Sequence, residues 1–230
     1  MNFTRYAIYH TPPHGALANL GAAWLGWDLV TAKPLAHPQA DGLDIAQITQ
    51  GPRKYGFHAT MKPPFRLAES HSAAALGDAL AAFCAGHTAV QLDTLAVTPL
   101  GRFIALTVQG DTGPLNSLAA QTVRVFDRFR AASTKGELAS RRARTLTPAQ
   151  DANLICWGYP HVMDGFRFHM TLTQRLDKPT RARALHYLTQ RLPPVPYTID
   201  ALSLVGERAD GMFQLIDRYP FATSVIPSDP

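Results

Sequence analysis

The chain has 230 residues, a formal net charge of +5, 46% hydrophobic residues and 17% charged residues. These values describe a soluble globular protein that is long enough to bury a core, as one large domain or two small ones. No stretch approaches the roughly 18 consecutive apolar residues of a membrane span, and the N-terminus lacks the pattern of a secretory signal, so we expect a cytoplasmic protein without membrane contact. The positive charge favours anionic partners, and a nucleic acid or a small phosphorylated substrate would fit equally well.

The two cysteines, Cys84 and Cys156, are too few for a disulfide framework. The sequence has neither a Cys-x-x-Cys nor a His-Glu-x-x-His motif, so it gives no support for a zinc site. We therefore expect no metal and no cofactor, and no feature of the sequence indicates an obligate protein partner.

Apolar periodicity, turn residues and capping residues predict the secondary structure. In chain order we expect a strand at 5–10, a helix at 15–27, a loop at 34–44, a strand at 55–61, a helix at 71–85, strands at 90–99 and 103–109, a helix at 115–131, a basic helical segment at 137–144, a helix start at Thr147 and Pro148, a strand at 166–173, a helix at 179–192, strands at 197–205 and 213–218, and a tail at 223–230.

A Phe-His-x-Thr motif occurs twice, at 57–60 and 168–171, and the two histidines are 111 residues apart. Each motif is followed by a helix, a strand, a turn and a further strand. From the His to the Phe that opens the last strand there are 45 residues in the first unit and 44 in the second. Matched order and spacing indicate an internal duplication. Each unit would form a small antiparallel sheet with a helix on one face, which is an α+β arrangement.

The alternation of strand side chains places each His of the motif on the same face as its Thr. In the first strand this face carries His58 and Thr60, and in the second it carries His169 and Thr171, while the phenylalanines point the other way. Two imidazoles and two hydroxyls that converge on one cleft suit acid–base chemistry at a phosphate.

With these motifs the chain resembles the 2H phosphoesterase superfamily. Within it, the chain looks like the DUF1045 branch, which is found among bacterial phosphonate-utilisation genes. The resemblance rests on residues 5–9, 55–65, 157–160 and 166–173. It implies a bilobal α+β fold with two pseudo-symmetric lobes, each an antiparallel sheet with helices on its outer face, around a central cleft. The lobes are expected at about 1–112 and 113–222 of a single domain.

The resemblance also implies metal-independent chemistry on cyclic or linear phosphodiesters. One of His58 and His169 would act as the general base and the other as the general acid, in an order that the sequence leaves open. Thr60 and Thr171 would donate hydrogen bonds to the phosphoryl oxygens. The genetic association of the branch makes ribose 1,2-cyclic phosphate 5-phosphate the expected substrate.

Four further residues are candidates for substrate binding, namely Lys62, Thr173, Tyr9 and Arg141. Lys62 shares the strand face of the first motif, but the proline that follows it interrupts the strand. Basic clusters at 53–54 and 141–144 would suit a second phosphate, and the latter would equally suit a solvated helix face.

Three other functions remain open from the sequence. The first is an RNA 2′,3′-cyclic phosphodiesterase or a 2′–5′ RNA ligase-like enzyme, which the scattered aromatic residues support little. The second is a phosphate-ligand binding module without catalysis, against which both intact motifs argue. The third is a metal-dependent phosphodiesterase.

Overall fold

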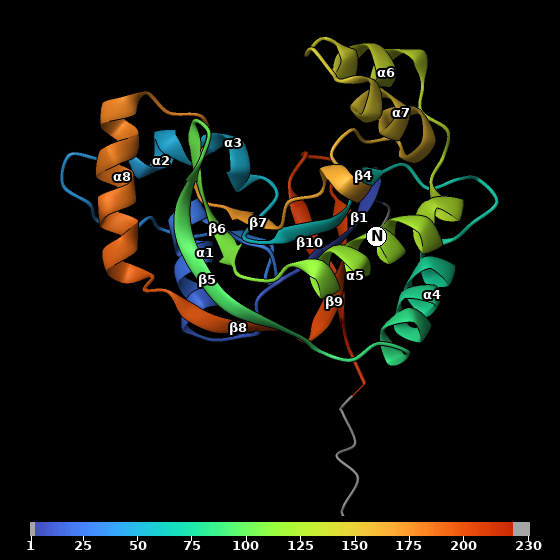
Figure 1. Cartoon of the computed structure of the whole chain (residues 1–230), viewed down its shortest axis with the longest axis horizontal. Coiled ribbons are helices and arrows are strands. Elements are labelled where there is room, and N and C mark those ends of the chain that lie inside the picture. Colours follow the sequence, from blue (N-terminus) through green and yellow to red (C-terminus); the bar gives the residue numbers. More distant parts are fainter. Residues whose placement is uncertain (1–2, 223–230) are drawn as a thin grey trace, which may run out of the picture.

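The computed structural model describes residues 3–222, and its centre is an eight-stranded sheet in the order β10-β9-β1-β4-β7-β6-β5-β8 (Figure 1). All neighbouring strands of this sheet are antiparallel. The strands are β1 (Arg5–His10), β4 (Ala59–Phe65), β5 (Val90–Leu100), β6 (Phe103–Gln109), β7 (His169–Thr171), β8 (Val195–Ile199), β9 (Ala201–Glu207) and β10 (Phe213–Pro220). Two short strands, β2 (Trp27–Asp28) and β3 (Lys33–Pro34), pair separately. The sheet and its packed helices confirm the predicted α+β class.

The helices divide into those that pack on the sheet and a pair that projects from it. The helices are α1 (Ala16–Leu25), α2 (Ile45–Ile48), α3 (Gln50–Arg53), α4 (Ala73–Ala85), α5 (Gly113–Phe126), α6 (Lys135–Arg142), α7 (Pro148–Trp157) and α8 (Lys178–Arg191), with 3₁₀ turns η1 (Asp127–Phe129) and η2 (Met163–Gly165). Side chains of α1, α2, α4, α5 and α8 share one core cluster, whereas α6 buries none of its residues. Figure 1 shows α6 and α7 standing together beyond the sheet. Across residues 3–222, no helix is long and apolar enough to cross a membrane.

The boundaries of α6 and α7 follow from their capping residues. Thr134 and Thr147 each accept a hydrogen bond from the backbone N–H three residues later, while Glu137 and Gln150 at those positions bond back to the cap. These capping boxes satisfy N–H groups that the first turn of a helix leaves without partners. Pro148 occupies the first turn of α7, so the predicted helix start is confirmed.

The prediction of one strand at 197–205 is wrong, because the chain breaks at Asp200. The carbonyl of Asp200 accepts a hydrogen bond from the N–H of Phe221 at 2.8 Å, and its carboxylate pairs with Arg218 at 2.6 Å. The break separates β8, which pairs with β5 at one edge of the sheet, from β9, which pairs with β1 and β10 near the other edge. Since one residue links strands that lie at opposite ends of the order, the sheet must curl strongly.

The strand order interleaves the two halves of the sequence. β9 and β10 lie beside β1 and β4, whereas β5 and β6 lie beside β7 and β8. The order of elements in both repeats agrees with the duplication, but hydrogen bonds between β6 and β7 cross the predicted lobe boundary near residue 112. The lobes at 1–112 and 113–222 therefore remain a prediction, and strands from both of them pair within the one sheet. The tail predicted at 223–230 lies outside the described residues.

β1 divides the interior into two apolar clusters. Tyr6 and Ile8 belong to the main core, together with side chains of the helices. Ala7 and Tyr9, which alternate with them, belong to a smaller cluster with Phe213 on the other face. Tyr6 and Tyr9 therefore lie on opposite faces of the strand, and the small cluster lies on the face that carries the candidate site.

Candidate active site

The β4–β7 pair brings the two His-x-Thr motifs together at the centre of the sheet. Ala59 of β4 lies directly opposite Met170 of β7, and neither side chain is exposed. Neighbouring side chains on each strand must point to the opposite face from this buried pair. Antiparallel pairing also crosses the motifs, so that each His faces the Thr of the other motif. The resulting cross-strand neighbours are His58 with Thr171 and Thr60 with His169.

His58 lies one residue before β4, so the strand predicted at 55–61 begins later than expected. The cause is a turn at Gly56, whose φ of 70° is available to glycine without strain. His58 Nδ1 bonds to the Gly56 carbonyl at 2.9 Å, so Nδ1 donates and Nε2 carries the lone pair. That Nε2 lies 3.1 Å from the hydroxyl of Thr60, which donates to it.

A tyrosine ring covers one face of His58. Tyr9 stacks on the imidazole with ring centroids 3.6 Å apart and an angle of 19° between the planes. Burial lowers the pKa of His58 from 6.5 to about 4, and the nearby His169 contributes in the same direction. His58 is therefore neutral near pH 7, with Nε2 ready to accept a proton.

His169 repeats the backbone contact of His58, but no aromatic ring of the described residues is stacked on it. Its Nδ1 donates to the carbonyl of Arg167 at 2.7 Å, which lies two residues before it, as Gly56 lies two residues before His58. Its nearest aromatic neighbour is Phe103, at 5.9 Å between ring centroids. Both imidazoles are thus held by the same local hydrogen bond, which directs each Nε2 away from the backbone.

A cavity of about 290 Å³ opens beside the two motifs. His58 and Thr171 line it, together with Thr173, Tyr55 and Arg175. Thr173 is nearly fully buried, and its hydroxyl accepts a hydrogen bond from the N–H of Ile104 at 3.0 Å. The proton of this hydroxyl therefore remains available for donation. Its place in the cavity wall agrees with strand alternation, which puts Thr173 on the same face as His169 and Thr171.

Tyr9 does not reach this cavity. Its side chain is fully buried, and burial raises the pKa of its hydroxyl well above 10. The prediction that Tyr9 contacts substrate is therefore corrected: the ring supports His58 from behind.

The prediction that Lys62 binds substrate is also corrected, because the register between β1 and β4 changes just before this residue. Tyr9 pairs with Thr60, but Ile8 pairs with Lys62, so one residue of β4 is left over as a bulge. A bulge of one residue moves the following side chain to the other face of the strand. Lys62 therefore points into the helix-covered side, where it is 1% exposed and donates to Asp127 at 3.1 Å.

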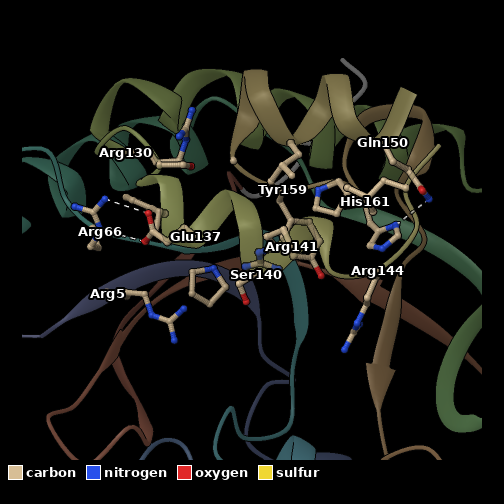
Figure 2. Close-up of a pocket in the computed structure, with 18 of the residues that line it drawn as sticks. Arg5, Arg66, Arg130, Glu137, Ser140, Arg141, Arg144, Gln150, Tyr159 and His161 are labelled. Carbon is tan, nitrogen blue, oxygen red and sulfur yellow. Dashed lines mark hydrogen bonds and ion pairs between the residues drawn. The ribbon is translucent and has the colours of Figure 1, made fainter. Parts of the chain in front are cut away.

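Arg141 lines a second, larger cavity of about 720 Å³ between the α6–α7 pair and the sheet. Its guanidinium lies over the ring of Tyr159, 4.6 Å from the centroid. Figure 2 shows Arg5 and Arg144 at opposite sides of this cavity, with Arg141 and Tyr159 between them. In the other predicted basic cluster, Arg53 is structural, since it donates to the carbonyls of Leu25 and Ala46, whereas the ammonium group of Lys54 lies 4.8 Å from the ring centroid of Tyr55.

Two groups that line these cavities were not predicted from the sequence. Arg175 borders both of them, and strand alternation could have found it, because it continues the series that begins at His169. His161 lines the larger cavity, and no local pattern distinguishes it from the other histidines. Among residues 3–222, no three His, Cys, Asp or Glu side chains gather as a possible metal site.

The chain belongs to the family described as "Protein of unknown function (DUF1045)", whose model matches residues 60–214. This range covers more than half of the chain and includes the second motif and most of the sheet. The predicted DUF1045 branch is confirmed.

Two curated relatives carry the name "Ribose 1,5-bisphosphate phosphokinase PhnN". The relative from Janthinobacterium sp. (strain Marseille) is 37% identical over 233 residues, which cover 96% of this chain and 51% of the relative. The relative from Laribacter hongkongensis (strain HLHK9) is 34% identical over 176 residues, which cover 76% of this chain and 41% of the relative. The chain thus spans about half the length of these relatives or less.

Two solved structures are similar over nearly the whole chain. E. coli LigT, crystallised with 3′-AMP, is 14% identical with a TM-score of 0.47, and the match covers 96% of this chain and 99% of LigT. TT0787 of Thermus thermophilus is 14% identical with a TM-score of 0.46 and the same coverage. Likeness at this level carries no conclusion about activity.

Proposed function

We propose that the chain is a metal-independent phosphoesterase of the 2H type, which opens a small cyclic phosphodiester by two-histidine acid–base catalysis. The observation that carries the proposal is the pairing of Ala59 with Met170. This pairing supports the proposal because strand alternation then directs both imidazoles and both threonine hydroxyls to one face, and His58 and Thr171 of this set line a cavity.

The different surroundings of the histidines favour one assignment of roles. With a pKa of about 4, His58 enters the reaction in the neutral form, so it serves as the base. Its Nε2 takes a proton from water while the water oxygen forms a bond to phosphorus. The ring P–O bond breaks, and His169, as imidazolium, gives its Nε2 proton to the departing alkoxide. The product is an open phosphate monoester, and exchange with solvent restores both histidines.

The threonines suit the charge that develops on the phosphoryl oxygens. Without substrate, the hydroxyl of Thr60 donates to His58 Nε2. A bound phosphoryl oxygen would take over this proton, which frees Nε2 for the attacking water. Thr171, which lines the cavity, would donate from the other strand. Donors placed where negative charge accumulates are worth about 10² to 10³-fold in rate each.

The curated relatives support a phosphorylated sugar as the substrate class. Their name refers to a ribose that carries two phosphates. Because the chain matches about half of these proteins or less, the kinase activity in the name is not carried over to it. A cyclic phosphodiester of ribose that bears a further phosphate, such as ribose 1,2-cyclic phosphate 5-phosphate in phosphonate breakdown, fits both the name and the site.

The test is turnover of ribose 1,2-cyclic phosphate 5-phosphate, followed by ³¹P NMR in excess chelator. We expect the cyclic diester signal to give way to a monoester signal at an unchanged rate with or without chelator. Loss of activity with chelator would point to a metal-dependent enzyme. Brisk turnover of RNA 2′,3′-cyclic ends without turnover of the sugar would contradict the substrate class. Tight binding without turnover of either would make the chain a binding module.

A further inference from the structure

The larger cavity has an excess of positive charge that its own residues do not neutralise. Six arginines and His161 line it, against one carboxylate, that of Glu137. Glu137 is already engaged, because it accepts from Arg66 and from the backbone of Thr134 at the start of α6. An arginine side chain has five N–H donors that require acceptor partners. The arginines without a carboxylate partner therefore determine which ligand the cavity can bind.

Half of the arginines have carboxylate partners. Arg5 pairs with Glu207, Arg66 with Glu137 and Arg130 with Asp127. The other three are Arg141, Arg144 and Arg175, and within residues 3–222 none of their side chains forms an ion pair with a carboxylate.

Arg142, which follows Arg141 on helix α6, differs from it in having a carboxylate partner. It forms two hydrogen bonds with Asp151 at 2.7 and 2.9 Å and does not line the cavity. Asp151 of helix α7 therefore neutralises Arg142 of α6, which does not line the cavity, while Arg141, one position earlier, lines it. The arrangement leaves the positive charge concentrated inside the cavity.

The cavity adjoins the smaller cavity beside the two motifs. Arg175 lines both cavities and follows the strand that carries His169 and Thr171. His161 lies within electrostatic reach of both regions, since its pKa is lowered by burial and then by the charges of Arg141, Arg144 and His169. A ligand whose reacting phosphate lies between the motifs would thus extend toward the unpaired arginines.

We infer that this arginine-lined cavity is a second phosphate subsite, and that it binds the distal phosphate monoester of a substrate whose cyclic diester lies at the two motifs. The inference rests on the proposed function and deepens it. A monoester carries nearly two negative charges near pH 7, and the planar guanidinium group donates to phosphate oxygens in pairs. Arg144 and Arg141 would hold the monoester, while Arg175 lies between the two phosphates.

The kinetic test compares adenosine 2′,3′-cyclic phosphate with the same compound carrying a 5′-phosphate. These substrates share the reacting group and differ only in the distal phosphate. We expect the wild type to prefer the phosphorylated compound in kcat/KM, mainly through KM, and Arg144→Gln to reduce this preference by about tenfold or more. Arg142→Gln, two residues earlier at the end of α6 and outside the cavity, is the matched control and should retain the preference.

Direct binding keeps the subsite testable without turnover. In isothermal titration calorimetry, ribose 5-phosphate should bind the wild type and the Arg142→Gln variant equally, and should bind Arg144→Gln about tenfold more weakly. Equal binding to all three, or no binding to any, would overturn the subsite. Failure of both adenosine compounds and of ribose 1,2-cyclic phosphate 5-phosphate to react, with the expected calorimetric difference intact, would instead contradict the proposed catalysis and leave the subsite standing.

Discussion

The two His-x-Thr motifs have the same backbone contact but different surroundings. Each histidine donates from Nδ1 to the carbonyl two residues earlier. His58 is stacked under Tyr9, accepts a hydrogen bond from Thr60 and has a pKa that burial lowers to about 4, whereas the ring of Phe103 is tilted by 59° against His169, with the ring centroids 5.9 Å apart. Identical residues in a duplicated frame can thus take different acid–base roles, because burial favours the neutral form of an imidazole.

Removal of either imidazole tests whether both halves take part in the reaction. Each proton transfer is typically worth about 10² to 10⁴-fold, so we expect His58→Ala and His169→Ala each to lower kcat by about 10³-fold on a cyclic diester. The rate should be measured with the thermal midpoint, which should change little since both side chains are only partly buried. If either variant retained full activity, the histidine that it lacks would have no part in the mechanism.

The threonines should have a smaller effect than the histidines. Thr60→Val and Thr171→Val keep the shape of the side chain and remove the hydroxyl. We expect kcat to fall about 10²-fold in each, as for the loss of one donor to a developing oxyanion, while Thr→Ser at the same positions retains most of the rate. If valine and serine variants behave alike, the hydroxyls are not donors to the phosphoryl group.

The ring of Tyr9 that stacks on His58 should control how kcat/KM depends on pH. A general base must be deprotonated, so kcat/KM falls as the pH drops through the pKa of His58, which is about 4. Tyr9→Leu removes the ring and admits water, so the pKa should rise toward 6.5 and the acidic limb should move upward by one to two units, estimated roughly from the reference value. Tyr9→Phe keeps the stack and should retain the wild-type profile. An unchanged profile in Tyr9→Leu would show that the stack does not set the pKa.

Lys62 distinguishes a buried structural charge from a ligand of the site. Burial lowers its pKa to about 8, although Asp127 opposes this. Below pH 8 the buried amine is charged, and its desolvation lowers the free energy of unfolding. This loss of stability disappears as the pH rises from 8 toward 10.5, the pKa of the amine in the unfolded chain. Because Arg130 still pairs with Asp127, Lys62→Met should be neutral to stabilising, by about 1–3 kcal/mol at pH 7.

The stability gain from Lys62→Met should shrink between pH 8 and 10.5 in denaturant titrations, since only the wild type loses a proton on folding in that range. The kcat/KM of this variant should equal that of the wild type. A loss of activity with unchanged stability would return Lys62 to the substrate-binding residues, against the register observed in β4.

The sequence predicted the parts of the fold and site that depend on local periodicity. The four long helices, the start of α7 at Thr147 and Pro148, and the common face of each His and Thr follow from spacing alone. Long-range effects were not accessible. The bulge that turns Lys62 inward depends on the register with β1, and the break at Asp200 depends on contacts with Arg218 and Phe221.

The difference between the histidines was likewise invisible to the sequence. The stacking of Tyr9 on His58 joins residues on two strands, and no pattern within either strand announces it. The arginine-lined cavity depends on the placement of α6 and α7 over the sheet. Strand parity does extend from His169 to Arg175, so the residue that borders both cavities was within reach of the same argument that identified the threonines.

The assignment of His58 as base and His169 as acid is tested most directly by changing the leaving group. A p-nitrophenyl phosphodiester expels an anion that needs no proton, whereas an alkyl cyclic diester expels an alkoxide that does. His169→Ala should therefore lose about 10³-fold on the cyclic diester but less than about tenfold on the p-nitrophenyl diester, while His58→Ala should lose a similar factor on both. Equal losses for both variants on both substrates, or the reverse pattern, would contradict the assignment.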